Sequence, residues 1–130
     1  MRDLLLQAAG VLAIIVALIH GTLGETRIFA QTDRRITIEP PQLRTLLRLV
    51  WQTGTVAWIG GGVLLFTAPL MASDVARHWI IVTMAVVFAF AAMANAWAKR
   101  GRHFGWMLLS AVVVMAMDRA RGTLNAGEKY

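Results

Sequence analysis

Four long runs of apolar residues dominate the pattern along the chain. No Asp, Glu, Lys or Arg occurs inside them, and short polar segments separate each run from the next; the runs are Leu4–Gly24, Leu49–Ser73, Trp79–Ala98 and His103–Met117. About 20 apolar residues at 1.5 Å per residue cross the roughly 30 Å hydrocarbon core of a bilayer. Inside lipid every backbone N–H and C=O group must be paired within the protein, so these runs predict membrane-spanning α-helices.

The predicted fold class is all-α: a polytopic membrane protein whose four transmembrane helices form one bundle and one domain, residues 1–130. The spans are expected at about residues 4–24, 46–70, 78–98 and 104–121. The second helix is expected to start ahead of its apolar run, because Pro41 suits a first helical turn and leucines follow it at helical spacing. The fourth apolar run is short, so its helix is expected to continue through Asp118 and Arg121.

Small residues indicate which helix faces pack together. Helices in lipid associate through close backbone approach and interhelical hydrogen bonds, so small side chains are expected along the contacts. They recur along one side of each of the first three spans: Ala9, Ala13, Ala17 and Gly21; Gly54, Ala57 and Gly61; and Ala85, Ala89, Ala92 and Ala96. The glycines at 60–62 predict a bend or a close helix crossing.

Composition and charge support a membrane location. Hydrophobic residues make up 58% of the chain, against about 45–50% in an ordinary soluble domain. The net charge of +6 lies in the segments between the apolar runs, which is typical of topology signals and not of a nucleic-acid-binding stripe. The chain has no cysteine, which excludes disulfides, thiolate metal sites and a cysteine nucleophile. The expected partner is therefore the lipid bilayer, with no nucleic acid.

The distribution of Lys and Arg predicts an orientation. Eight of these residues lie on the side of the membrane shared by loops 25–45 and 98–104, and five lie on the opposite side. Since cytoplasmic loops carry the excess of Lys and Arg, both loops are expected in the cytoplasm and both termini outside.

Polar residues gather at one membrane face, where helices one and three end and helices two and four begin. The candidate ligand-binding residues there are His20, Glu25, Arg48, Gln52, Asn95 and His103. The favoured interpretation is a structural network, with Glu25 paired to Arg27, Arg48 or Arg102 and the other side chains exchanging hydrogen bonds. The alternative is a site for a lipid headgroup, a metal ion or haem.

Two histidines and a carboxylate in this cluster define the metal hypothesis. His20, Glu25 and His103 are ligand types that suit zinc, iron or copper. His20 and His103 are also candidate axial ligands of a haem iron. No motif predicts a cofactor. An enzyme in which Glu25 orients His20 as a base is a third possibility, and neither a nucleophile motif nor a phosphate loop supports it.

The middle of the membrane restricts the function classes. Ion-coupled transporters, proton pumps and voltage sensors place an ionisable residue within a span, and none is expected at mid-depth here. The leading hypothesis is a non-enzymatic membrane protein that acts by association, as a homo-oligomer or as a small accessory subunit of a larger membrane complex. The alternative is a protein that binds a metal, haem or lipid through the His20 and His103 end.

Three sequence stretches carry a resemblance to a known group of proteins. They are a His-x-x-x-Gly-Glu stretch from His20 to Glu25, the tryptophans Trp51 and Trp58, and the stretch Gly101–Trp106. With them the chain resembles a family of uncharacterised bacterial four-span inner-membrane proteins. The resemblance covers most of the chain and implies a bacterial inner-membrane location but no particular activity. Relatives of that kind commonly carry a histidine where Gln52 stands, and this departure weakens the metal and haem hypotheses.

Overall fold

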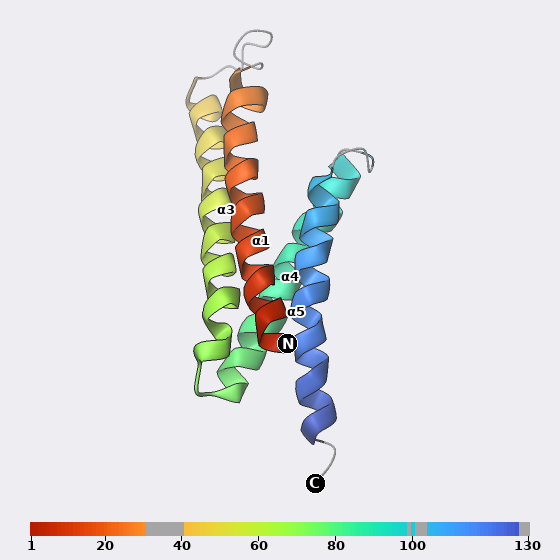
Figure 1. The fold of residues 1–130 in the computed structure, drawn as a ribbon. Coiled ribbons are helices and arrows are strands. Elements are labelled where there is room, and N and C mark those ends of the chain that lie inside the picture. Colours follow the sequence, from red (N-terminus) through yellow and green to blue (C-terminus); the bar gives the residue numbers. More distant parts are fainter. Residues whose placement is uncertain (31–40, 99, 101–103, 128–130) are drawn as a thin grey trace.

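The computed structural model describes residues 1–30, 41–98, 100 and 104–127. Within these residues the protein is a bundle of four helices without strands, which confirms the all-α prediction (Figure 1). The elements in chain order are α1 (Arg2–Leu23), a π-helical turn η1 (Gly24–Phe29), α3 (Pro41–Thr67), a 3-10 turn η2 (Ala68–Leu70), α4 (Asp74–Ala98) and α5 (Gly105–Gly127).

Three helical segments are long and apolar enough to cross a bilayer. They are Asp3–Phe29, Pro41–Leu70 and Asp74–Ala98, and each exceeds the roughly 20 residues that a crossing needs. The apolar part of α5 is shorter, Gly105–Asp118, and the helix continues beyond it to Gly127. This is the architecture of a multi-pass membrane protein.

The first helical segment continues further than the sequence predicts. The predicted span ends near residue 24 and a loop follows, whereas the chain stays helical through η1 to Ala30. The reason is tertiary packing, because Glu25 and Phe29 of η1 contact side chains of α3. From Pro41, the first described residue after the gap, the chain is already helical, so the second helix does begin ahead of its apolar run, as predicted.

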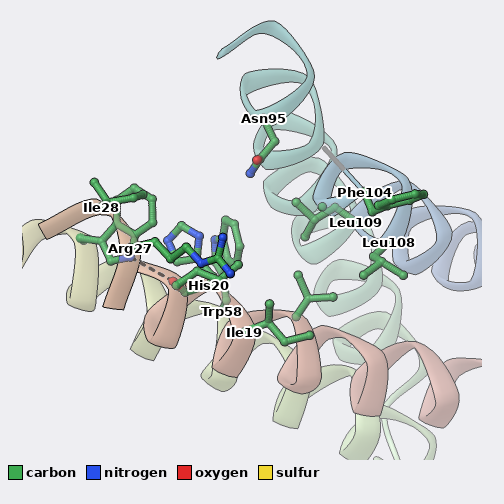
Figure 2. A pocket seen from close by; sticks show the side chains of 13 residues that line it. Ile19, His20, Arg27, Ile28, Trp58, Asn95, Phe104, Leu108 and Leu109 are labelled. Carbon is green, nitrogen blue, oxygen red and sulfur yellow. Dashed lines mark hydrogen bonds between the residues drawn. The ribbon is translucent and has the colours of Figure 1, made fainter. Parts of the chain in front are cut away.

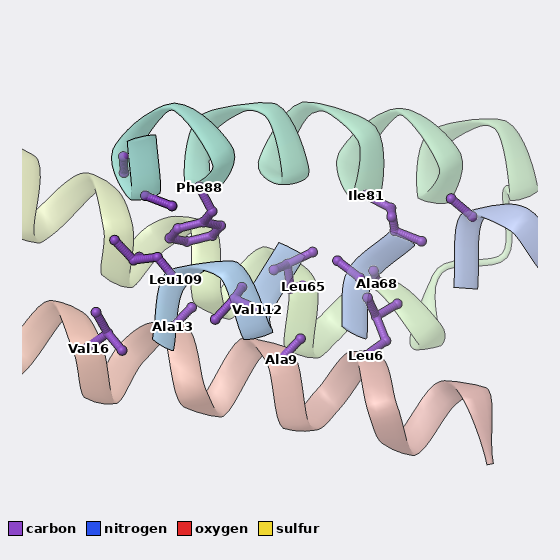
Figure 3. Packing of buried hydrophobic residues seen from close by; sticks show 14 residues of the cluster. Leu6, Ala9, Ala13, Val16, Leu65, Ala68, Ile81, Phe88, Leu109 and Val112 are labelled. Carbon is purple, nitrogen blue, oxygen red and sulfur yellow. The ribbon is translucent and has the colours of Figure 1, made fainter. Parts of the chain in front are cut away.

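The four helices form two pairs. α1 packs along α3 and also along α5, and α4 packs along α5, whereas α3 and α4 contact each other little. Figure 1 shows the pair α1/α3 separating from the pair α4/α5 toward the end where α1 and α4 finish. The core fills the remaining length, where fully buried residues from all four helices meet (Figure 3), among them Leu6, Ala9, Leu65, Phe88, Leu109 and Val112.

Small residues bring α1 and α3 together, partly as the sequence predicts. Ala9, Ala13 and Ala17 are fully buried, in agreement with the predicted face of α1. A Cβ added to Gly10 would lie 2.6 Å from the carbonyl oxygen of Gly62, so the two backbones cross in direct contact.

The predicted contact face of α3 is wrong in part. Gly61 does contact α4, because a Cβ there would lie 2.8 Å from the sulfur of Met84. Gly54, in contrast, has no neighbour within 4 Å of an added Cβ, and Ala57 is exposed. The crossing with α1 uses Gly62 instead, which is rotated by one residue from the predicted face.

The turn between η2 and α4 lies at the end of the bundle opposite to the separated helix ends, and side-chain bonds stabilise it. The Ser73 hydroxyl accepts the backbone N–H of Ala76 at 3.3 Å. Arg77 donates to the carbonyl oxygen of Met71 at 2.8 Å and pairs with Asp74 at 3.1 Å. These bonds stabilise the turn that joins η2 to α4.

Candidate binding site between the helix pairs

An ion pair and a hydrogen bond join η1 to α3. The Nε of Arg48 lies 2.8 Å from Oε2 of Glu25, and the side-chain amide of Gln52 donates to Oε1 at 2.9 Å. Arg48 and Gln52 are four residues apart and therefore lie on the same face of α3. Both carboxylate oxygens of Glu25 are thus bound by α3. We call these three residues the Glu25 cluster.

Aromatic contacts extend the Glu25 cluster along the α1/α3 contact. The guanidinium of Arg48 lies 5.6 Å from the centre of the Phe29 ring, and Phe29 meets Trp51 edge to face at 6.0 Å. The indole N–H of Trp51 donates to the carbonyl oxygen of His20 at 3.2 Å. The indole occupies space that Gly24 leaves free, because a Cβ on Gly24 would overlap its Nε1. This side of α1 is closely packed.

His20 lies against two tryptophans of α3. Its ring stacks on Trp51 with centroids 4.1 Å apart and planes 7° apart, and it contacts Trp58 at 4.6 Å with a tilt of 39°. Trp58 in turn contacts Phe88 of α4 at 6.4 Å. These contacts fix the plane of the imidazole through its faces and leave its edge, which carries the two nitrogens, available.

A cavity of about 400 Å³ opens beside His20, between the two helix pairs. We call it the cleft. Figure 2 shows the two sides of its wall. Residues of α1, η1 and α3 form one side, and residues of α4 and α5 form the other. Most of the wall is apolar, and its residues include Val16, Ile19, Leu23, Ile28, Trp58, Phe104, Leu108 and Leu109.

Besides the indoles of Trp51 and Trp58, three polar side chains line the cleft: His20, Arg27 and Asn95. His20 and Arg27 are seven residues apart, which places them two turns apart on one side of the first helical segment, while Asn95 reaches the cleft from α4 (Figure 2). Among the described residues, none of these three side chains makes a hydrogen bond or an ion pair with another group. Polar groups at membrane depth are costly to leave without partners, so water or a bound molecule has to supply them.

The structure divides the predicted cluster into two sets. Glu25 pairs with Arg48, one of the three arginines that the network interpretation allows. Gln52 bonds to Glu25 as well, and not to His20 or Asn95 as that interpretation expects. His20 and Asn95 line the cleft instead. His103 lies outside the described residues.

Arg27 is a cleft residue that sequence reasoning treats only as a candidate partner of Glu25. Its distance of seven residues from His20 is the signal that could have found it, because positions i and i+7 share a helix face. That signal holds only if the helix continues past Gly24, where the sequence predicts a loop. Because the sequence predicts that the helix ends near Gly24, it does not predict that Arg27 shares a helix face with His20.

One of the three proposed metal ligands is Glu25, and both of its carboxylate oxygens are already bound by side chains of α3. Over residues 1–30, 41–98, 100 and 104–127, no three His, Cys, Asp or Glu side chains are grouped to hold a metal ion. The proposed ligand His103 is outside these ranges, so the full set His20, Glu25 and His103 stays a prediction.

Comparison with known proteins identifies no relative of this chain. No family model matches the chain, and no curated protein or solved structure is significantly similar to it. The function has to follow from the arrangement of the protein's own residues.

Proposed function

We propose that the protein binds an amphipathic molecule in the cleft. The apolar part of the ligand lies against Ile19, Leu108 and Leu109, and its polar end bonds to His20 and Asn95. One observation carries this proposal: three polar side chains that have no partner among the described residues line a mostly apolar cavity between the two helix pairs. An apolar pocket with a few convergent polar groups is the usual form of a small-molecule site.

The volume of the cleft limits the size of the occupant. Ligand pockets span about 300 to 1,000 Å³, and an apolar cavity of about 150 Å³ holds one benzene. At about 400 Å³ the cleft holds roughly two to three such rings, or the equivalent length of one hydrocarbon chain. The occupant is therefore a single-chain amphiphile and not a whole two-chain phospholipid.

Native mass spectrometry in mild detergent tests this proposal with hexadecanol and hexadecanoic acid as probes. At least one probe should bind saturably, with one molecule per chain. The double variant His20→Phe/Asn95→Leu should weaken that binding roughly thirtyfold, because two hydrogen bonds of about 1 kcal/mol each are removed. Phenylalanine retains a flat ring between Trp51 and Trp58, so the packing of α1 on α3 should be preserved.

A matched control removes a polar group at the same depth and outside the cleft. The hydroxyl of Thr53 bonds to the carbonyl oxygen of Leu49 in its own helix at 2.9 Å, so Thr53→Val should leave probe affinity unchanged. Binding that does not saturate, or that the double variant retains in full, would reject the proposal. An absorption spectrum and elemental analysis of the same sample test the other two ligands. A Soret band would show that the protein binds haem, and stoichiometric metal would show that it binds a metal ion, and either result would contradict the amphiphile proposal.

A second candidate function is association with other membrane helices, as a homo-oligomer or as an accessory subunit. The outer face of α3 supports it, because Gly54 and Gly60 have no neighbour within 4 Å of an added Cβ and Ala57 between them is exposed. Small residues of this kind allow a second helix to approach closely. Replacing Gly60 with Leu should dissociate a complex that native mass spectrometry detects for the wild type. A wild-type protein that is strictly monomeric and has no co-purifying partner would contradict this candidate.

We further propose that the protein resides in a bacterial inner membrane, with the loops at 25–45 and 98–104 on the cytoplasmic side. The support is the excess of Lys and Arg on that side, seven in these two segments plus Arg48, against five on the opposite side, together with the motif resemblance described above. The single-cysteine variants Arg100→Cys and Tyr130→Cys, in a chain that otherwise has no cysteine, allow a direct test in intact spheroplasts. A membrane-impermeant thiol reagent should label only the terminal site, and labelling of Arg100→Cys alone would invert the orientation.

A further inference from the structure

The cleft has an uncompensated positive charge at one end. Arg27 is the single charged side chain among the described residues that line it, and no carboxylate pairs with its guanidinium there. The nearest carboxylate in the sequence, Glu25, is held by Arg48 at 2.8 Å on the other side of the helical segment. The neighbouring ion pair therefore leaves Arg27 available to a ligand.

The chemistry of arginine defines what Arg27 would bind. A guanidinium presents a planar set of donors that matches the two oxygens of a carboxylate or a phosphate, and such charge-assisted hydrogen bonds are about twice as strong as neutral ones. Arg27 lies near the end of the Asp3–Phe29 segment, the depth at which Arg meets lipid headgroups. Val16 and Leu109, farther from that end, form the apolar continuation of the cleft.

We infer that the occupant of the cleft is an acidic single-chain amphiphile whose carboxylate or phosphate group binds Arg27. This inference rests on the proposed function and adds the chemical class of the ligand. The headgroup bonds to Arg27 and lies within reach of His20 and Asn95, and the chain extends past Leu108 and Leu109 toward Val16. A neutral headgroup would use His20 and Asn95 and would leave the charge of Arg27 without a counterion.

Three ligands that share one chain separate the contribution of charge from that of the chain. Hexadecanoic acid, hexadecyl phosphate and hexadecanol are compared in nanodiscs of neutral phosphatidylcholine, at a pH at which both acids are ionised. Each ligand displaces a nitroxide-labelled chain from the wild-type protein, and its concentration is expressed as mole fraction in the bilayer. At least one acid should bind roughly tenfold more tightly than the alcohol, because a hydrogen bond to a charged group adds about that much.

Substitutions of Arg27 assign the preference to this residue. Arg27→Gln should reduce the advantage of the acid to less than about twofold and leave alcohol affinity unchanged, and Arg27→Lys should retain part of the advantage because the charge remains. Arg100→Gln is the matched control, because it removes one positive charge in the connection between α4 and α5 and Arg100 does not line the cleft. It should preserve the full preference.

The outcomes distinguish this inference from the proposed function. Equal affinities for the acids and the alcohol in the wild type, or a preference that Arg27→Gln retains, would overturn the acidic ligand while saturable binding upholds the cleft as a site. Absence of saturable binding for all three ligands would overturn both. A preference for the phosphate alone or the carboxylate alone would support the inference and identify the headgroup.

Discussion

The two sides of the first helical segment treat their polar residues in opposite ways. On the side toward α3, Glu25 has both oxygens bound, and Gly24 leaves room for an indole that donates to the backbone of His20. On the side toward the cleft, the side chains of His20 and Arg27 have no hydrogen-bond partner among the described residues. Side chains within eight positions of one another thus serve packing on one side and remain available on the other. The comparison teaches that polar residues at a membrane face can serve packing alone, and that the proposed site rests on the polar side chains beside the cavity that have no partner among the described residues.

The largest expected effect comes from filling the crossing between α1 and α3. In Gly10→Ala the new Cβ would meet the backbone of Gly62 and Phe66 at 2.6 Å, and backbone atoms can move aside only if the helices separate. The free energy of unfolding, measured by detergent titration in mixed micelles, should fall by about 2 kcal/mol. In Gly54→Ala the Cβ meets nothing within 4 Å, so this control should be neutral or more stable by up to about 0.5 kcal/mol. Equal effects of the two variants would contradict the close crossing.

The next effect concerns the Glu25 cluster. Glu25→Ala should lower the free energy of unfolding by about 1 kcal/mol, an amount limited by the partial exposure of both ion-pair partners. A double-mutant cycle with Arg48→Ala isolates the pair and should give a coupling energy of about 0.5 kcal/mol or more that decreases with added salt. Probe affinity should change little, because Glu25 does not line the cleft. A coupling energy near zero would show that the pair does not hold η1 against α3.

The smallest effect on stability is expected on the cleft side. Asn95→Leu removes an amide that has no hydrogen-bond partner among the described residues, so the free energy of unfolding should stay within about 0.5 kcal/mol of the wild type. Probe affinity should decrease in the same variant. The two variants should therefore give opposite results. Glu25→Ala should lower the free energy of unfolding and leave probe affinity unchanged, whereas Asn95→Leu should lower probe affinity and leave the free energy of unfolding unchanged. A large loss of stability in Asn95→Leu would place Asn95 in a structural network instead.

The sequence predicts the helices well because their signal is local. Runs of apolar residues identify the all-α class, the leucines ahead of the second apolar run indicate that α3 begins before that run, and the alanines of α1 mark its buried face. The sequence does not predict that α1 continues into η1, because contacts of Glu25 and Phe29 with α3 maintain that turn. The position at which this helical segment ends therefore depends on packing between residues that are far apart in the sequence.

The sequence predicts at which end of the bundle the polar side chains gather, but not which of them bond to one another. Depth along each span brings His20, Glu25 and Asn95 to one membrane face, and this follows from counting residues. Their partners depend on how each helix is rotated about its axis, which the apolar pattern does not determine. Glu25 had three candidate arginines, and rotation of α3 selects Arg48. The same rotations leave His20 and Asn95 beside a cavity and bring Arg27 to its wall.

Photolabelling of the protein in nanodiscs tests most directly whether an amphiphile occupies the cleft. Hexadecanol and hexadecanoic acid that carry a diazirine within the chain are crosslinked by light, and the labelled residues are mapped by peptide mass spectrometry. We predict that at least one probe labels both the Ile19–Ile28 segment and the Phe104–Leu109 segment, and that excess unlabelled ligand suppresses this labelling. Labelling that is equally strong at exposed positions outside the cleft, such as Val56 and Val86, and that resists competition would contradict a bound ligand.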